Sequence, residues 1–280
     1  MKITVLIENT APEGSGLAFE HGLSLLLNYK DKTILLDTGS SGDFADNAEK
    51  LGVDLKAVDF GVLSHGHYDH GDGLRRFFRE NETAPFYIRQ GADAPLFSVD
   101  DRGVRYIGVH REIWEESGSR FRPTSGKFSL GDGLWLTSCT HRDPAFTGRA
   151  VNLVYKRGED DFVPDDYRHE QSLVCETEKG LIVFNSCSHA GVVNIIRDVL
   201  ADFPGQQVYA MVGGLHMFGR GESGMNCTPD YVFSVADELK KLGVTEIHTG
   251  HCTGEPALAL MRQRFGEGCT ALTGGQVFSF

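Results

Sequence analysis

The stretch from residue 63 to residue 74 contains four potential metal ligands close together. Imidazole and carboxylate groups are the donors that a divalent metal such as zinc binds. The preceding run, 59–63, reads as a buried strand, and a loop at a strand end can turn all four side chains toward one point, as a helix could not. A histidine-rich surface turn is the alternative, but this density of donors, with glycines between them, favours a metal site. The candidate ligands are His65, His67, Asp69 and His70.

Three further motifs occur at the ends of predicted strands. Asp37 lies in the sequence LDTG, His189 in SCSHAG and His251 in TGHCTG. Strand ends are where open α/β sheets bind ligands. A turn-forming role is the alternative for Asp37.

This set of motifs resembles that of the metallo-β-lactamase superfamily. The resemblance implies an α/β fold, a metallo-β-lactamase-like four-layer αβ/βα sandwich with a two-metal site between its sheets. The combination of EHGLS at residues 20–24 with SCSHAG and GHCTG is narrower. It resembles the branch that includes dihydropterin ribofuranosyl-aminobenzene phosphate synthase of methanopterin biosynthesis.

The family resemblance implies two divalent metal ions, with zinc favoured and manganese or iron as alternatives. Three protein ligands at each ion would leave room for water, as a hydrolytic site requires. The resemblance also gives Asp37 the role of orienting a metal-bound histidine. It assigns His65, His67 and His189 to one ion and Asp69, His70 and His251 to the other.

One departure from the family pattern concerns the strand predicted at 207–212, whose end usually carries a bridging aspartate. Here Gly213 and Gly214 follow the strand, and His216 is the nearest donor. His216 is expected to give a proton to a leaving group or to act as an accessory ligand, with a packed strand-end histidine as the alternative. Because two divalent cations would then face a single aspartate, the excess of positive charge favours an anionic substrate.

Further assignments concern the reaction and the substrate. Asp69 is expected to take part in catalysis as well as in metal binding. His21 and Gly214 are expected to contact the substrate, although a lone histidine is more often structural. A solvated surface loop is favoured for the histidines of the irregular segments, namely His110, His141 and His169.

Apolar periodicity and turn residues predict alternating strands and helices. In the first half, strands are predicted at 2–8, 23–29, 32–37 and 59–63, with helices at 43–51 and 74–78. The pattern loosens from 81 to 131. In the second half, strands are predicted at 151–155, 172–176, 181–184, 207–212 and 245–248, with helices following the metal motifs and Thr228. Since both halves repeat strand, metal histidine and helix without a linker, a single domain over residues 1–280 is predicted.

Composition limits the partners and the compartment. The chain of 280 residues has 39 acidic against 27 basic residues, and this net charge of −12 disfavours nucleic-acid binding. No signal peptide and no apolar run near the roughly 20 residues of a membrane span are recognised. Six cysteines without C-x-x-C spacing fit a reduced, cytoplasmic setting. A cytoplasmic protein without nucleic-acid or membrane partners is expected, and its oligomeric state is left open.

These observations predict a metal-dependent enzyme of the dinuclear hydrolase type that acts on a small anionic metabolite bearing phosphate or carboxylate. Two alternatives stay open. One is a transferase similar to the synthase of the narrower branch, and the other is a non-catalytic, metal-dependent ligand sensor. A nuclease is disfavoured, because the chain has neither a long insertion nor a basic arm for RNA.

Overall fold

The computed structural model describes residues 1–148, 152–158 and 161–280. The chain forms two compact units and alternates between them. The first unit comprises 1–124, 151–169 and 273–280, and the second comprises 125–150 and 170–272. The single domain over residues 1–280 stays a prediction.

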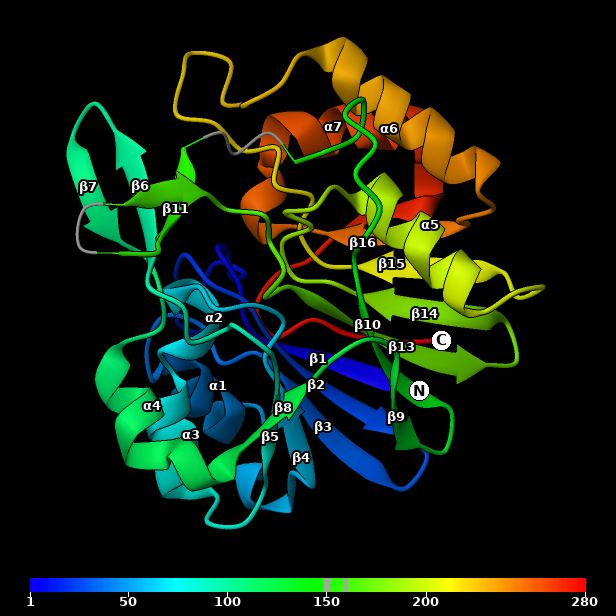
Figure 1. Cartoon of the computed structure of the whole chain (residues 1–280). Helices are drawn as coiled ribbons and strands as arrows, with labels where there is room; N and C mark the ends of the chain where they lie inside the picture. Colours follow the sequence, from blue (N-terminus) through cyan, green and yellow to red (C-terminus); the bar gives the residue numbers. More distant parts are fainter. Residues whose placement is uncertain (149–151, 159–160) are drawn as a thin grey trace. The chain divides into compact units, whose positions relative to one another are not determined.

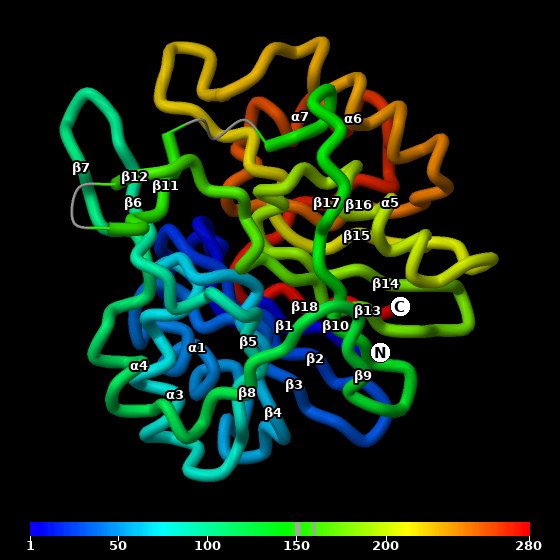
Figure 2. The backbone as a smooth tube through the Cα atoms, in the orientation of Figure 1, coloured from blue at the N-terminus to red at the C-terminus, as the bar shows by residue number. Residues whose placement is uncertain are grey.

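The first unit is built on a seven-stranded sheet (Figure 1). In order across the sheet, its strands are β18 (Val277–Ser279), β1 (Lys2–Ile7), β2 (Ser24–Tyr29), β3 (Lys32–Leu36), β4 (Phe60–Val62), β5 (Phe86–Arg89) and β8 (Phe121–Thr124). The strands from β18 to β3 pair antiparallel, and those from β3 to β8 pair parallel. Because β1 pairs with β18, the two ends of the chain lie side by side (Figure 2).

Two amphipathic helices, α1 (Asp43–Lys50) and α3 (Leu74–Glu80), pack against this sheet. Their apolar sides bury Phe44 and Phe77 completely in a core shared with Leu35 of β3. Burying side chains of this size contributes about 1.5–3 kcal/mol each, so the apolar spacing seen in the sequence is what holds these helices in place. The shorter helical elements are η1 (Leu55–Ala57), α2 (Tyr68–Gly71), α4 (Arg111–Ser117) and η2 (Gly118–Arg120).

A small antiparallel sheet also belongs to the first unit. In order, its strands are β12 (Phe162–Pro164), β11 (Leu153–Lys156), β6 (Leu96–Asp100) and β7 (Gly103–Tyr106). Phe97 packs edge-on against Tyr106 and Phe162, with ring centroids 5.4 and 5.3 Å apart. Strand β11 occupies most of the strand predicted at 151–155, although Val151 itself lies outside the described residues.

The second unit is built on another seven-stranded sheet. In order, its strands are β17 (Cys269–Ala271), β16 (Glu246–Thr249), β15 (Val208–Val212), β14 (Gly180–Phe184), β13 (Gln171–Thr177), β10 (Leu134–Ser138) and β9 (Phe128–Gly131). The strands from β17 to β14 pair parallel, and those from β14 to β9 pair antiparallel. Each unit therefore contains one sheet that is half parallel and half antiparallel.

Three helices, α5 (Val192–Asp202), α6 (Pro229–Lys241) and α7 (Glu255–Phe265), pack with the parallel strands of this sheet (Figure 1). Thr228 begins α6 as predicted, because its side chain accepts a hydrogen bond from the Tyr231 N–H and satisfies a donor of the first turn. The core buries Ile196 of α5 and Leu239 of α6 completely. The remaining short elements are η3 (His251–Thr253) and η4 (Gly266–Gly268).

The predicted metal motifs all follow strands of the parallel halves. In the first unit, Asp37 follows β3 and the loop that begins at Ser64 follows β4. In the second unit, the segments carrying His189, His216 and His251 follow β14, β15 and β16. Since parallel strands point the same way, each unit collects its motifs at one edge of its own sheet.

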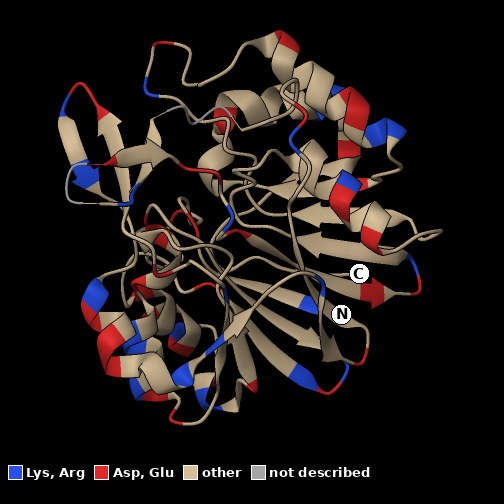
Figure 3. Ribbon diagram, in the orientation of Figure 1, with Lys and Arg blue, Asp and Glu red and all other residues tan. Residues whose placement is uncertain are grey.

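Charge and hydropathy bear on the expected partners. Each of the helices α3, α4, α5 and α6 carries both acidic and basic residues (Figure 3). Over the described part of the chain, no helix has both the length and the apolar character needed to cross a bilayer.

Candidate metal centre

The loop after β4 forms a compact cluster of imidazoles in the first unit. His65 and His70 are fully buried, and His67 is 4% exposed. The ring of His65 lies 4.6 Å from that of His67 and 4.3 Å from that of His70, measured between centroids. Hence three of the four predicted ligands of this loop converge, as a strand-end loop allows.

Asp37 holds this cluster from the end of β3. Its carboxylate accepts hydrogen bonds from the Ser64 N–H and the Ser64 Oγ, each at 2.7 Å, and from Nδ1 of His70 at 2.7 Å. Because the Ser64 hydroxyl proton points to Asp37, Nδ1 of His65 must be the donor in its 2.8 Å contact with Ser64 Oγ. Both His65 and His70 therefore carry their proton on Nδ1 and their lone pair on Nε2, the tautomer of a metal ligand. The predicted orienting role of Asp37 stays a prediction, and these contacts are the ones it requires.

Asp69 lies between two imidazoles. Its Oδ2 is 3.5 Å from Nε2 of His70 and 3.3 Å from Nε2 of His21. The side chain of Asp69 is 11% exposed and that of His21 is 51% exposed, so His21 forms the solvent side of the group. This position suits the predicted substrate contact of His21, which stays a prediction.

His169 lies in the core of the first unit, and the surface-loop interpretation is wrong for it. It is 2% exposed, and its ring lies 6.2 Å from that of His65 and 5.5 Å from that of His67. Nδ1 accepts the Gly66 N–H at 3.1 Å, and Nε2 donates to Asp165 at 3.0 Å. Because both ring nitrogens are engaged, His169 can fix the histidine loop but cannot ligate a metal in this arrangement. The sequence offered no signal for this contact, since 103 residues separate it from Gly66.

The other two histidines of the irregular segments are partly exposed, and each pairs with an aspartate. The side chain of His110 is 65% exposed and its Nδ1 lies 2.6 Å from Asp72. His141 is 47% exposed and its Nδ1 lies 2.8 Å from Asp198. Their surface positions agree with the prediction.

The environment of His67 favours the neutral imidazole that binds cations. Burial, followed by the neighbouring His169, lowers the pKa of His67 to about 3. The nearby carboxylates of Asp69 and Asp165 oppose this shift without cancelling it. This lowered pKa keeps the ring uncharged at neutral pH. Protons therefore do not compete with a metal ion for its nitrogen lone pair.

The second unit collects another set of donors from three strand ends. The rings of His189 and His216 lie 4.2 Å apart between centroids. Ligand atoms lie within 4.8 Å of one another in two groups, one of Cys187, His189 and His216 and the other of Cys187, His251 and Cys252. Sequence reasoning did not include these cysteines among the ligands. The available signal was that each stands within two residues of a predicted metal histidine.

Glycines at the end of β15 explain the absence of a carboxylate there. A side chain at Gly213 would meet the Asn185 carbonyl oxygen at 2.0 Å, and one at Gly214 would meet Cys252 Sγ at 2.4 Å. The Gly214 N–H donates to the Ser186 carbonyl, and its carbonyl accepts from the Ser188 hydroxyl. Gly214 is thus fully engaged in packing, and its predicted substrate contact stays a prediction.

A buried carboxylate fixes the backbone at His189. Glu170, which is 1% exposed, accepts hydrogen bonds from the N–H groups of His189 and Ala190 at 2.8 and 3.0 Å. His216 is half-buried, and its Nδ1 is buried with no hydrogen-bond partner in the part of the chain that is described. A buried polar atom of this kind is costly unless a ligand satisfies it, which fits the predicted ligand or proton-donor role.

The backbone is strained at both clusters. Among the described non-glycine residues, seven have positive φ, and four of these belong to the metal motifs: Asp37 (59°), Ser188 (54°), His216 (48°) and His251 (47°). Such conformations cost about 1–3 kcal/mol each and concentrate at functional sites. The tautomers, the buried donors and this strain together fit a centre for divalent cations in which imidazole dominates.

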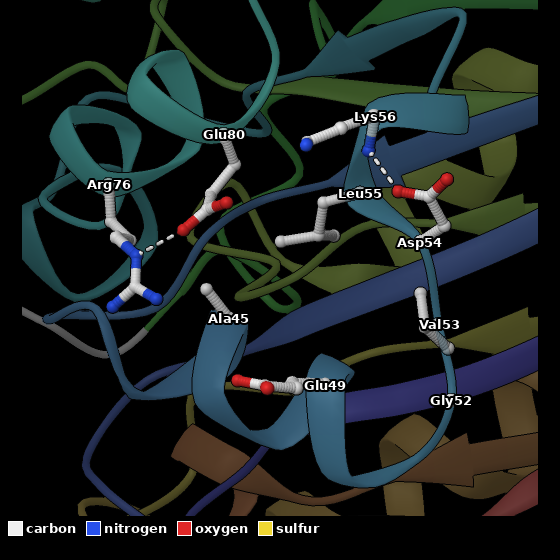
Figure 4. Close-up of a pocket in the computed structure, with 9 residues that line it drawn as sticks. All are labelled: Ala45, Glu49, Gly52, Val53, Asp54, Leu55, Lys56, Arg76 and Glu80. Atoms are coloured by element: carbon white, nitrogen blue, oxygen red, sulfur yellow. Dashed lines mark hydrogen bonds and ion pairs between the residues drawn. The ribbon is translucent and has the colours of Figure 1, made fainter.

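A separate pocket of about 390 Å³ in the first unit shares no residue with the histidine cluster (Figure 4). It lies between α1, η1 and α3. Arg76 pairs there with Glu80 at 2.8 Å, and the Asp54 carboxylate caps η1 by accepting the Lys56 N–H. These charged groups therefore serve the surrounding helices.

The family and the fold follow from comparison with known proteins. The chain belongs to the metallo-beta-lactamase superfamily, whose sequence profile matches residues 17–171. The predicted α/β class and metallo-β-lactamase fold are confirmed.

Relatives along the full length are more specific. The 7,8-dihydropterin-6-methyl-4-(beta-D-ribofuranosyl)-aminobenzene-5'-phosphate synthase of Methanocaldococcus jannaschii is 28% identical over 291 residues, which cover 100% of this chain and 97% of that protein. The crystal structure of Tm1679, a metal-dependent hydrolase of the beta-lactamase superfamily, matches with a TM-score of 0.82 and 27% identity, covering 100% of this chain and 99% of that one. Zn²⁺-bound PqqB from Methylobacterium extorquens, with a TM-score of 0.58, 13% identity and full coverage of both chains, shares the fold.

Proposed function

We propose that this protein is a metal-dependent enzyme of the dinuclear hydrolase type that acts on a small anionic metabolite bearing phosphate or carboxylate. The observation that carries the proposal is the buried Asp37 carboxylate, which forces the metal-binding tautomer on His70 directly and on His65 through Ser64. A histidine that binds a metal through one ring nitrogen usually donates the N–H of its other ring nitrogen to a group such as a carboxylate.

In this proposal, two divalent cations are held by His65, His67 and His189 and by Asp69, His70 and His251, with zinc favoured over manganese or iron. When bound, such ions lower the pKa of water and neutralise negative charge on a substrate. Asp69 is placed to accept a proton from the attacking water, because its Oδ2 lies beside His21 on the exposed side of the group. His21 is suited to contact the substrate, and His216 to donate a proton to the leaving group.

The anionic substrate is supported by charge. Asp69 is the one carboxylate in the proposed ligand set, and the glycines after β15 leave no space for another. The positive charge of two divalent cations then exceeds the negative charge of their ligands. A phosphate or carboxylate group of the substrate would neutralise this excess. The cytoplasmic setting and the absence of nucleic-acid and membrane partners remain part of this proposal.

A synthase-like transferase is the second candidate, and the full-length relative from Methanocaldococcus jannaschii favours it. A condensation in which phosphate leaves would use the same charged centre, with a second substrate in place of water. The two reactions therefore differ in the attacking group, which is water in hydrolysis and the second substrate in condensation.

The test is an assay of the purified protein against phosphate esters, lactones and the substrates of the synthase, with and without chelator. Hydrolysis that is lost with chelator and restored by zinc supports the first proposal. Product formed solely from the two synthase substrates supports the second. Tight binding of a small molecule without turnover would overturn both in favour of a ligand sensor, and activity that persists in His65→Ala and Asp69→Ala would exclude metal catalysis at this site.

A further inference from the structure

Cys187 occupies a central place among the donors of the second unit. Its Sγ belongs to both groups of ligand atoms described above, one that includes His189 and one that includes His251. These two histidines are the ones that the proposed function assigns to different ions. A donor shared by both groups is placed as a bridging ligand would be.

The two cysteines of these groups, Cys187 and Cys252, differ in their contacts. Cys252 Sγ lies 3.6 Å from the Cys187 carbonyl oxygen, to which it donates, and 3.3 Å from the His216 backbone N–H, from which it accepts. Cys252 is therefore engaged by backbone groups at the ends of two other strands. Cys187 is 2% exposed, and its sulfur is the one common to both groups, so its position is the one that a ligand shared by two ions requires.

The lack of space for a carboxylate after β15 also points to Cys187. The bridging carboxylate expected after β15 cannot be accommodated, because side chains at Gly213 and Gly214 would collide with the Asn185 carbonyl and with Cys252 Sγ. The histidines of the second unit are neutral as ligands and supply no negative charge. A thiolate supplies that charge from a different strand end, namely the end of β14.

We propose that Cys187 Sγ bridges the two metal ions as a thiolate and replaces the carboxylate that the sequence lacks. On binding, the thiol releases its proton to solvent, and sulfur lone pairs form the two metal bonds, without any change in oxidation state. Because thiolate is a soft ligand, this donor selects zinc or cobalt over manganese. The assignment rests on the metal binding proposed above.

Titration of the metal-free protein with cobalt(II) tests the bridge, because a cobalt–thiolate bond gives a charge-transfer absorption in the near ultraviolet. In the wild-type protein this absorption should grow through two equivalents. Cys187→Ala should abolish it and weaken binding by at least about 10-fold, as for loss of a supporting ligand contact. Cys227→Ser, at a half-buried cysteine outside both groups, is the matched control and should behave as wild type.

The outcomes separate the two proposals. If cobalt does not bind, both the metal-dependent function and the thiolate fail. If two equivalents bind without the absorption, or if Cys252→Ala abolishes it while Cys187→Ala does not, the assignment of Cys187 fails and the proposed function stands. Saturation of the absorption at one equivalent would overturn the bridge.

A measurement on the wild-type chain covers the case in which Cys187→Ala does not fold. Alkylation by iodoacetamide, followed by peptide mapping, should label Cys187 at least about 10-fold more slowly with zinc than without it, because a metal-bound sulfur is a poor nucleophile. Cys227 should be labelled equally in both conditions. Equal labelling of Cys187 with and without zinc would contradict the proposal.

Discussion

The donor clusters of the two units are built in different ways. In the first unit, one short loop supplies four donors, and a single carboxylate, Asp37, fixes two of the rings through hydrogen bonds. In the second unit, the donors come from the ends of three strands, and a buried carboxylate, Glu170, accepts hydrogen bonds from the backbone N–H groups of His189 and Ala190. The second cluster also contains sulfur.

The difference shows two routes to a pre-organised site. A local loop needs a carboxylate to choose the tautomer and the direction of each ring. A cluster assembled from parallel strand ends depends on the sheet, on glycines that permit close packing, and on left-handed backbone at the predicted ligands. Four variants should separate these routes.

The largest effect is expected when a ring of the loop is removed. His65→Ala should lower both metal affinity and metal-dependent turnover by more than the roughly 100-fold seen when an outer partner of a ligand is lost. Metal content by mass spectrometry and turnover with saturating zinc provide the measurements. His110→Ala, which removes an exposed histidine, is the matched control, and an equal loss in the two variants would contradict the assignment.

Asp37→Asn should weaken metal binding by about 10–100-fold, because the amide no longer attracts the Nδ1 proton of His70 with a full charge. The substitution preserves shape, so the melting temperature should change less than the metal affinity. Competition with a chelator measures the affinity. Asp31→Asn, in an exposed turn, should have no effect, and if Asp37→Asn matches it, the carboxylate does not support the cluster.

Glu170→Gln should have the opposite profile. Its carboxylate accepts the backbone N–H groups of His189 and Ala190, so we expect a loss of about 1–3 kcal/mol in the free energy of unfolding. The metal affinity of the folded protein should fall less than in Asp37→Asn. Urea unfolding and chelator competition on the same preparation give both numbers, and a larger effect on metal binding than on stability would show that the two carboxylates act alike.

The smallest effect is expected at Asp198, which binds the N–H groups of Thr140 and His141 and the His141 ring. Burial acts to raise the pKa of Asp198, but the hydrogen bonds from His141 and Thr140 lower it below its ordinary value. A lowered pKa in the folded state stabilises the protein above about pH 4, and this contribution is lost as the pH falls through the folded-state value. Asp198→Asn should therefore lose about 1 kcal/mol at pH 7 and less at pH 3, with metal affinity unchanged.

Unfolding free energies measured from pH 7 to pH 3 check this prediction. A constant difference between Asp198→Asn and wild type over that range would mean that the carboxylate charge plays no part. A change in metal affinity would place Asp198 in the second cluster, from which its contacts separate it.

Much of the chain follows from sequence, where local patterns decide structure. The strands at the start of the chain and α1 lie within a residue or two of their predicted bounds, because alternation and amphipathic spacing are local signals. The segment 81–131 was less predictable. It forms β5 to β9 and α4, and some of these strands have partners far along the chain, such as β11 for β6.

By itself, the sequence determined the family, the α/β class and the residues that carry imidazole and carboxylate donors, since each of these is written in a short motif. The tertiary structure alone decided which tautomers those imidazoles adopt, that His169 lies against the histidine loop, and that Cys187 is shared by two groups of donors. The physical reason is that hydrogen-bond partners and close packing depend on residues distant in sequence, which meet once the strands have paired.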